Sequence, residues 1–324
     1  MKIYHPNGYL RMESDTINPM FFVQFERLLD FYTQQDQQHT YYAQCTATWG
    51  CNESPISDLE KQALLDFYEA SKGWNWRINT NWANDTEEFS SNPCTDHWYG
   101  VRCNVHGEVI SLHFLENNLR LTRWPDTFKN LKNLKYLAIF NGDVEFEWNE
   151  NFNANSINAF PPDEVIKELT NLEEINFYLA QINGAIGTGI FSLTKPKYLN
   201  LAYNKMTGSL PSGNWGNLAN LEILELQNCS FTGAIPDDLN VLPSLSYINL
   251  SNNNLTGQIP IFENSQQLVG VDFSQNNLYR WPEEYFDKEQ FLNLEFCNAN
   301  FNADVTVEPE ICKRTHYCFK QAVL

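Results

Sequence analysis

One short apolar pattern, L-x-x-L-x-L-x-x-N-x-L, recurs through the second half of the chain and constrains the fold more than any other feature. Successive copies begin 25, 24, 23 and 23 residues apart. The five copies are Pro196-Leu199-Leu201-Asn204-Met206, Leu221-Leu224-Leu226-Cys229-Phe231, Leu245-Ile248-Leu250-Asn253-Leu255, Leu268-Val271-Phe273-Asn276-Leu278 and Phe291-Leu294-Phe296-Ala299-Phe301. A fixed period of this length indicates a repeat architecture in which each copy is one structural unit.

Each copy predicts one coil of a solenoid. The alternation around L-x-L makes a short strand whose leucines point inward, and the asparagine that follows can turn its side-chain amide toward backbone groups of the neighbouring coil. A single coil cannot bury its own leucines, so the copies must stack and their strands must form one parallel sheet. Residues that alternate with the leucines then face the open side of that sheet.

Three further copies precede this array. They are Val109-Leu112-Phe114-Asn117-Leu119, Leu134-Leu137-Ile139-Gly142 and Leu172-Ile175-Phe177-Ala180-Ile182. Their starts, continued to Pro196, lie 25, 38 and 24 residues apart, so the second of the three copies carries extra residues. We place this excess in residues 143–162, a loop rich in asparagine and aromatic residues. A long loop inside a regular array is either functional or irregular.

A helix is expected just before the array. Ser57-Asp58-Leu59-Glu60 is a capping box, in which the serine and the glutamate each satisfy a free amide at a helix start. The helix should run to about Lys72 and end at Gly73. Its apolar face is expected to cover the open end of the solenoid, which would otherwise expose leucines.

The segment after this helix is rich in tryptophan and leads into C-x-x-x-W-x-G-V-x-C, spelled by residues Cys94 to Cys103. The order of helix, tryptophan loop and cysteine motif resembles the amino-terminal cap of plant-type, extracellular leucine-rich-repeat proteins. Tails such as Thr232-Gly233-Ala234-Ile235-Pro236 match the L-x-G-x-I-P ending of the plant-type repeat. The resemblance covers Ser57 to Phe301, and the family includes polygalacturonase-inhibiting proteins and receptor ectodomains. It implies a second short strand and a tight helical turn on the convex side of each coil.

The fold class expected from the pattern and the resemblance is α/β, a right-handed leucine-rich-repeat solenoid of about eight repeats. Its parallel sheet is concave, its helical N-terminal cap is stapled by a disulfide, and its C-terminal cap is short. We divide the chain into a partly helical N-terminal extension (1–56), the N-terminal cap (57–107), the repeats (108–301, with an insertion at about 143–162) and the C-terminal cap (302–324). Within the extension, residues 28–32 repeat the sequence of residues 64–68, which indicates a partial duplication of the cap helix.

The eight cysteines fall mostly in short local pairs. Cys94 and Cys103 are spaced to bridge a short loop, and Cys45 is expected to close on Cys51. Near the end of the chain, one choice pairs Cys312 with Cys318 and another uses Cys297. Cys229 should be a buried free thiol, since Cys297 lies three coils away, about 14 Å at the usual strand spacing.

Local cystine pairs predict an oxidising location, extracellular or at the cell surface, although the chain begins without a visible signal segment. No apolar run is long enough for a membrane-spanning helix. The formal charge of -19 argues against nucleic acid or an anionic membrane as the main partner. The histidines are scattered without metal-ligand spacing, and there is no phosphate-binding glycine loop. The sequence therefore predicts a protein that is not an enzyme and needs no metal or cofactor.

A binding surface follows from the repeat register, because side chains between the leucines face the concave side. The residues chosen on this face are Tyr136, Phe140, Glu174, Asn176, Tyr178, Tyr198, Asn200, Glu225, Gln227, Tyr247, Asn249 and Asp272. Exposed aromatic rings beside amides and carboxylates are suited to stacking and hydrogen bonding with a ligand. The alternative is a solvated face on which tyrosine is simply a good strand residue.

The function that these observations favour is a non-catalytic extracellular recognition module that binds a protein or peptide ligand on its concave face. The family resemblance suggests two more specific roles for the module, as an inhibitor or as a co-receptor. Its partner would then be a polysaccharide-degrading enzyme or a receptor. One alternative is a structural subunit of a larger assembly, held by the aromatic loop and the first 56 residues. Another is glycan or ice binding, for which Thr207, Thr232 and Thr256 supply only three rungs of a threonine ladder.

Overall fold

The computed structural model describes residues 2–4, 10–13, 56–82, 91–141, 154–262, 264–280 and 296–298. The chain forms two units, residues 1–53 and 54–324. In the first unit, β1 (Lys2–Tyr4) pairs antiparallel with β2 (Leu10–Glu13). The helix expected in the extension, the Cys45 and Cys51 pair and the Cys312 and Cys318 pair lie outside the described residues.

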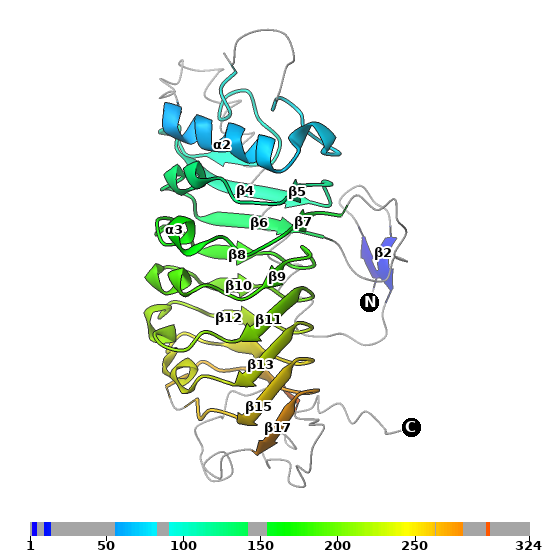
Figure 1. Ribbon diagram of the computed structural model, residues 1–324, viewed down its shortest axis with the longest axis vertical. Coiled ribbons are helices and arrows are strands. Elements are labelled where there is room, and N and C mark those ends of the chain that lie inside the picture. Colours follow the sequence, from blue (N-terminus) through cyan, green and yellow to red (C-terminus); the bar gives the residue numbers. More distant parts are fainter. Residues whose placement is uncertain are drawn as a thin grey trace. The chain divides into compact units, whose positions relative to one another are not determined.

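The second unit contains a main sheet of nine strands, stacked in the order of the chain (Figure 1). The strands are β3 (Val101–Cys103), β4 (Val109–Leu115), β6 (Tyr136–Phe140), β8 (Glu174–Asn176), β10 (Tyr198–Asn200), β12 (Ile223–Glu225), β14 (Tyr247–Asn249), β16 (Gly270–Asp272) and β18 (Phe296–Asn298). Only β3 runs antiparallel to its neighbour. The other eight are parallel, one for each copy of the pattern, which confirms a leucine-rich-repeat solenoid of eight repeats.

A second parallel sheet forms where the tails of the repeats run. It contains β9 (Asn183–Gly184), β11 (Lys205–Ser209), β13 (Ser230–Ala234), β15 (Asn254–Gln258) and β17 (Asn277–Arg280). Glycine is needed in the tails because the backbone takes a left-handed conformation there, with φ of 77° at Gly233. In the coils before β9, where the tails depart from the consensus, β5 (Arg120–Leu121) and β7 (Ser156–Ile157) form a separate pair.

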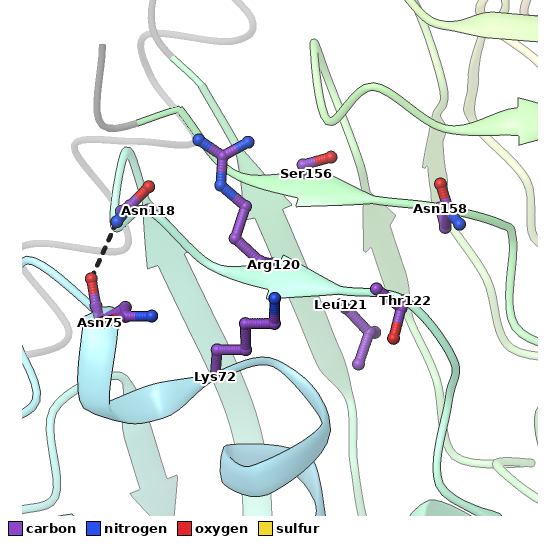
Figure 2. Close-up of a pocket in the computed structure, with 8 residues that line it drawn as sticks. All are labelled: Lys72, Asn75, Asn118, Arg120, Leu121, Thr122, Ser156 and Asn158. Carbon is purple, nitrogen blue, oxygen red and sulfur yellow. Dashed lines mark hydrogen bonds between the residues drawn. The ribbon is translucent and has the colours of Figure 1, made fainter. Parts of the chain in front are cut away.

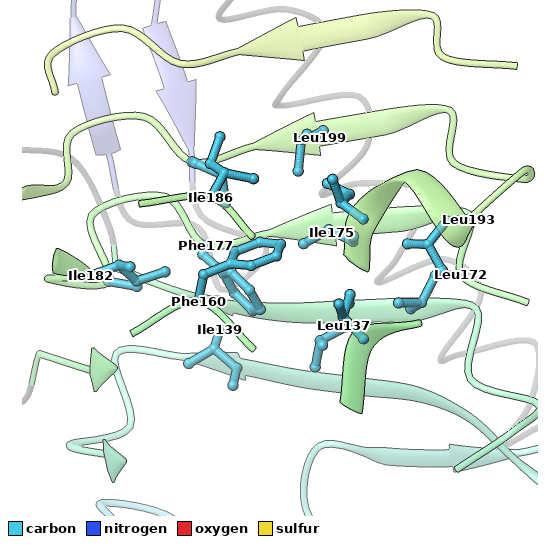
Figure 3. Packing of buried hydrophobic residues seen from close by; sticks show 14 of the residues in the cluster. Leu137, Ile139, Phe160, Leu172, Ile175, Phe177, Ile182, Ile186, Leu193 and Leu199 are labelled. Atoms are coloured by element: carbon cyan, nitrogen blue, oxygen red, sulfur yellow. The ribbon is translucent and has the colours of Figure 1, made fainter. Parts of the chain in front are cut away.

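Short helical turns complete the coils on the side away from the main sheet. They are η2 (Asp126–Asn130), α3 (Asp163–Ile166), η3 (Thr188–Ser192), η4 (Trp215–Asn217) and η5 (Asp237–Val241). Between the turns and the main sheet, the inward leucines of successive coils form one continuous core. Figure 3 shows this packing around Ile175 and Phe177, with the ring of Phe160 lying 6.1 Å from that of Phe177 between centroids.

A ladder of buried asparagine side chains joins neighbouring coils along the core. Asn253 donates from Nδ2 to the carbonyl of Leu226 in the preceding coil at 2.8 Å, and its Oδ1 accepts from the backbone N–H of Phe231 at 3.0 Å. Asn204 makes the same two kinds of bond to the coil before it. At the ladder position of the coil between them, the thiol of Cys229 donates to the carbonyl of Leu201 at 3.3 Å.

Cys229 is a buried free thiol, as predicted. Its burial, more than any other cause, raises the pKa of the thiol to about 11, so the group stays protonated and keeps its weak donor near neutral pH.

The structure corrects the position of the insertion and of one ladder residue. We predicted Gly142 at the ladder position and placed the extra residues in 143–162. The ladder position is instead filled by Asn155, which donates to the carbonyls of Phe114 at 2.8 Å and Phe140 at 3.0 Å. Because β7 follows at once and pairs with β5, residues 155–162 belong to the regular coil and the extra residues precede them.

The last copy also has a different register from the predicted one. The pattern placed Leu294 opposite Val271, but β18 pairs with β16 so that Cys297 lies opposite Val271. The coil between these strands is therefore three residues longer than predicted. Apolar residues at 291, 292, 294 and 296 give several possible alignments, so the side-chain pattern alone specifies this strand weakly.

The cap helix α2 (Asp58–Ala70) lies across the end of the stack next to β4 (Figure 1). Ser57 caps it, accepting from the backbone N–H of Glu60 at 3.2 Å and donating to the Glu60 carboxylate at 3.0 Å. On the buried face, the ring of Phe67 lies 5.8 Å from that of Phe114 in the first repeat. The predicted disulfide between Cys94 and Cys103 closes the loop that follows, with an S–S distance of 1.99 Å.

Glu60 also ties the cap to the first repeat, because its Oε1 accepts from the backbone N–H of Val109 at 3.1 Å. Burial raises the pKa of Glu60 above its ordinary value of 4.5. The contribution of this group to the free energy of unfolding is therefore fully present below pH 4.5 and is lost as the pH rises through the folded-state pKa.

We predict that Glu60→Gln gains stability relative to the wild type as the pH is raised from about 4 to about 7. The glutamine keeps an acceptor for Val109 but carries no charge to desolvate. Urea unfolding of both proteins at the two pH values measures the difference. A difference that does not change with pH would show that the charge on Glu60 costs nothing in the folded state.

A second prediction concerns the ladder. Asn253→Ala should lower the free energy of unfolding by about 3 kcal/mol, because it leaves buried backbone groups of two coils without partners. Cys229→Ala, at the same position of the preceding coil, should cost only about 1 kcal/mol, since one weak thiol donor is lost. Urea unfolding followed by circular dichroism measures both. Equal losses would contradict the role given to the asparagine amide.

Candidate functional site

The strand register places the predicted site residues in two rows on the open face of the main sheet. Tyr136, Glu174 and Tyr198 lie opposite one another on β6, β8 and β10, and the row continues through β12 to Tyr247 on β14. The second row is Asn176, Asn200, Glu225, Asn249 and Asp272 on β8 to β16. The rows are continuous, as the repeat spacing predicted.

The exposure expected for the middle of these rows is wrong. Tyr198 has only 1% of its surface exposed, and Asn200 and Glu225 are fully buried. The hydroxyl of Tyr198 donates to Glu225 Oε2 at 2.6 Å, and Asn200 Nδ2 donates to the same oxygen at 2.6 Å and to the tyrosine oxygen at 2.8 Å. Parallel strands lie about 4.8 Å apart, so long polar side chains of neighbouring coils reach one another and bond sideways.

Other predicted residues are also engaged in local structure rather than open to solvent. Asn249 and Asp272 are buried, and each accepts through Oδ1 from the backbone N–H and the hydroxyl of a serine two residues later, Ser251 and Ser274. Gln227 and Phe140 are buried as well. These side chains support the face but offer a ligand little surface.

Half-exposed side chains remain on the first part of the face. We call Tyr136, Glu174, Asn176, Tyr178 and Tyr203 the tyrosine patch. Two of its rings come together just beyond the ends of β8 and β10, where the Tyr178 and Tyr203 centroids are 5.2 Å apart and the rings meet edge to face. Tyr247, further along the first row, is also half-exposed.

Sequence reasoning missed Tyr203, because it is not one of the residues that alternate with the leucines. It precedes the ladder residue Asn204, and its backbone is left-handed with φ of 58°. Leu179, Asn228 and Asn252 precede the ladder positions of other coils and share this conformation. The signal that could have found it is this recurring bend, which a period-2 pattern does not describe.

Electrostatics keep the phenols of Tyr198 and Tyr247 neutral. Burial raises the pKa of Tyr198 well above its ordinary value, and the charge of Glu225 raises it further. The pKa of Tyr247 is raised by burial and then by the charge of Asp272. At neutral pH both phenols can therefore donate hydrogen bonds to the carboxylates beside them.

His113, at the edge of the face, is partly exposed, but its Nε2 is buried. Its pKa is lowered to about 3, mainly by desolvation, so it is neutral at physiological pH. Within the described residues there is no group of three histidine, cysteine or acidic side chains that could hold a metal ion. In the same residues no helix is both long and apolar enough to cross a bilayer.

The exposed threonines of the second sheet do not share one row. Thr207 lies opposite Ser230, Thr232 opposite Asn254 and Thr256 opposite Asn277. Equivalent residues of successive tails are therefore staggered by two positions along the sheet. The three rungs expected from the sequence are not aligned as a threonine ladder.

Tyr198→Phe should lower the free energy of unfolding by about 2 kcal/mol near pH 7, because the buried carboxylate of Glu225 loses a donor. The matched control is Tyr136→Phe on the same row, whose hydroxyl has no partner among the described residues. That variant should change stability by less than about 0.5 kcal/mol. Denaturant unfolding compares the two. Equal, small effects would contradict the buried network.

Comparison with known proteins agrees with the fold and shows what the chain is similar to. The model of the leucine rich repeat N-terminal domain matches residues 57–104, and the leucine rich repeat model matches residues 220–242 and 244–264. Receptor like protein 24 of Arabidopsis thaliana is 31% identical over 105 residues. That alignment covers 32% of this chain and 11% of the relative, so the chain matches only about a tenth of the relative's length.

Two solved structures share the fold. A plant ice-binding protein has 24% identity and a TM-score of 0.58, over 76% of this chain and 72% of that chain. The crystal structure of a Pollen Receptor Kinase 3 has 25% identity and a TM-score of 0.52, over 68% of this chain and 96% of that chain. The repeats and the cap thus define a leucine-rich-repeat protein. Through its N-terminal domain and these relatives, the chain is similar to leucine-rich-repeat proteins of plants.

Proposed function

We propose that this chain is a non-catalytic recognition module, extracellular or at the cell surface, that binds a protein or peptide ligand through the tyrosine patch. The family supports this location and role, since the curated relative is named a receptor-like protein and the cap carries a disulfide. The observation that carries the proposal is the patch itself. It joins half-exposed aromatic rings, an amide and a carboxylate on adjacent strands of a rigid sheet.

The chemistry of the patch suits a peptide. Tyrosine offers a large, rigid contact surface with a polar end, and such residues dominate binding energies at protein interfaces. Glu174 supplies a negative charge that would attract a basic side chain. Asn176 uses its Oδ1 to accept from the backbone N–H of Tyr178 at 3.2 Å, which leaves its Nδ2 as a donor for a ligand carbonyl.

The buried cluster beside the patch would pre-organise it. Glu174 is the strand neighbour of Tyr198, whose hydroxyl is fixed by Glu225, so the floor of the face loses little freedom when a ligand binds. The half-exposed tyrosines from β6 to β14 span four strand spacings, about 19 Å. An extended peptide of about six residues would cover that length.

The more specific versions of this function, a co-receptor and an inhibitor, differ in the kind of partner that is bound. A co-receptor would hold a peptide or a second ectodomain on the patch, and an inhibitor would hold a folded polysaccharide-degrading enzyme. A second candidate function is a permanent subunit of an assembly. It is favoured by large apolar side chains exposed on the cap, Leu59 at 66%, Val105 at 56% and Trp74 at 54%.

The test is affinity capture from extracts of the source organism, with the full chain as bait. The variant combines Tyr136→Ala with Tyr178→Ala, and we expect it to lose at least about tenfold in captured partner. The control combines Thr207→Ala with Thr256→Ala on the second sheet and should capture as well as wild type. Thermal melts of both variants verify folding. A further bait carries Trp74→Ser. A partner that is captured by the tyrosine variant but not by the Trp74→Ser variant would favour the assembly subunit instead.

A further inference from the structure

A hollow of about 510 Å³ lies away from the main sheet, where the end of the cap helix meets the first two coils (Figure 2). Lys72 lies in the turn that follows α2, Arg120 and Thr122 lie at and just after β5, and Ser156 and Asn158 lie at and just after β7. All of these residues belong to the described part of the second unit. The hollow is separate from the tyrosine patch and from the function proposed for it.

The charge of the hollow is opposite to that of the protein. The chain has 40 acidic and 21 basic residues, yet of the described residues that line this space two are cationic and none carries a carboxylate. Lys132, Lys135 and Lys197 each pair with a glutamate. Within the described ranges, neither Lys72 nor Arg120 has an acidic partner. Two cations that line one hollow and have no acidic partner among the described residues favour a bound anion.

Two backbone carbonyls near the cationic wall already accept hydrogen bonds. The carbonyl of Ser71 accepts from the backbone N–H of Arg120 at 3.0 Å. The carbonyl of Asn75 accepts from Asn118 Nδ2 at 2.9 Å, the bond drawn in Figure 2. These two backbone oxygens are therefore occupied by backbone and side-chain amides and not by the cations. The guanidinium of Arg120 therefore keeps its donors for a ligand.

The opposite wall adds neutral donors. The carbonyl of Leu121 accepts from the backbone N–H of Asn158 at 2.9 Å, and Asn158 Oδ1 accepts from Asn183 Nδ2 at 3.4 Å. Asn158 Nδ2 and the hydroxyls of Thr122 and Ser156 have no partner in the part of the chain that the structure describes. These groups and the two cations can all donate hydrogen bonds to a ligand group made of acceptors only.

The backbone at Lys72 is an independent sign that its side chain is used. Lys72 takes a left-handed conformation, with φ of 55° and ψ of 52°. Glycine is the usual residue in this conformation just past a helix end, because a Cβ is disfavoured there. Here the glycine comes one residue later, at Gly73, and the strained position keeps a long cationic side chain. Such strain is often retained where the side chain has a role.

We propose that this hollow binds a phosphate or sulfate group carried by a polar ligand. Arg120 presents a planar fork that matches two oxygens of the anion, and Lys72 supplies a second charge. The hydroxyls of Thr122 and Ser156 and the amide of Asn158 donate to the remaining oxygens or to the body of the ligand. A volume of about 510 Å³ is in the range of sites for small organic molecules, so the group belongs to a ligand larger than the free ion.

The test titrates the full chain with sodium phosphate or sodium sulfate, replacing chloride at constant ionic strength, and follows the melting temperature. We expect a saturable rise for the wild type with at least one of the two anions. Lys72→Gly should fold at least as well, since glycine suits the backbone, yet lose about tenfold in affinity for the anion. Arg120→Gln should lose at least as much.

The hollow variant combines Lys72→Gln with Arg120→Gln and removes two positive charges from the lining. The control removes two positive charges elsewhere, by combining Lys129→Gln with Lys205→Gln. The control should respond to the anion as the wild type does, and the hollow variant should not. An equal rise in every protein would overturn the proposal, because sulfate and phosphate stabilise folded proteins generally by exclusion from their surfaces. No saturable rise with either anion would overturn it too. Saturation with only one anion identifies the ester.

Discussion

The side-chain amide at the ladder position is the interaction on which the rest of this structure depends. A coil of about 24 residues has too few apolar side chains to bury its own backbone, so every coil relies on the next one. Asn253 satisfies that need from inside the core, by bonding a carbonyl and an N–H of the preceding coil. Because the bonds have fixed lengths, they also fix the spacing of the strands, and the open face inherits that regular spacing.

Regular spacing has a chemical effect on the face. Side chains of neighbouring coils stand one strand apart, which is close enough for Tyr198, Asn200 and Glu225 to bond with one another. Polar residues in the middle of the sheet are therefore buried and bonded to one another, and the partly exposed side chains that remain are mainly those of the tyrosine patch. The hollow at Lys72 arises differently, where the cap helix ends against irregular tails and several donors have no partner among the described residues.

The repeats, the cap helix, the Cys94–Cys103 disulfide and the rows of the face could be predicted because each follows from spacing along the chain. The burial of Tyr198 could not, since it depends on which side chains meet across strands. Asn155 was missed because the extra residues separate it from its strand, although Asn155-Ser156-Ile157 followed by Phe160-Pro161 spells the end of a repeat. The hollow at Lys72 is lined by residues up to more than 80 positions apart in the sequence, so no local sequence pattern predicts it.

The asparagine ladder resumes at Asn155 after the extra residues, and this has a consequence for the evolution of such a chain. Asn141 donates to the carbonyl of Asn155 at 3.0 Å, and Asn155 restores the bonds to the earlier coils at once. Asn141 and Asn155 are thus bonded directly to each other, so the register of the later coils does not depend on how many residues lie between these two positions. This point of the solenoid can accept new surface without refolding its neighbours, which makes it a place where related proteins can diverge in partner while keeping one scaffold.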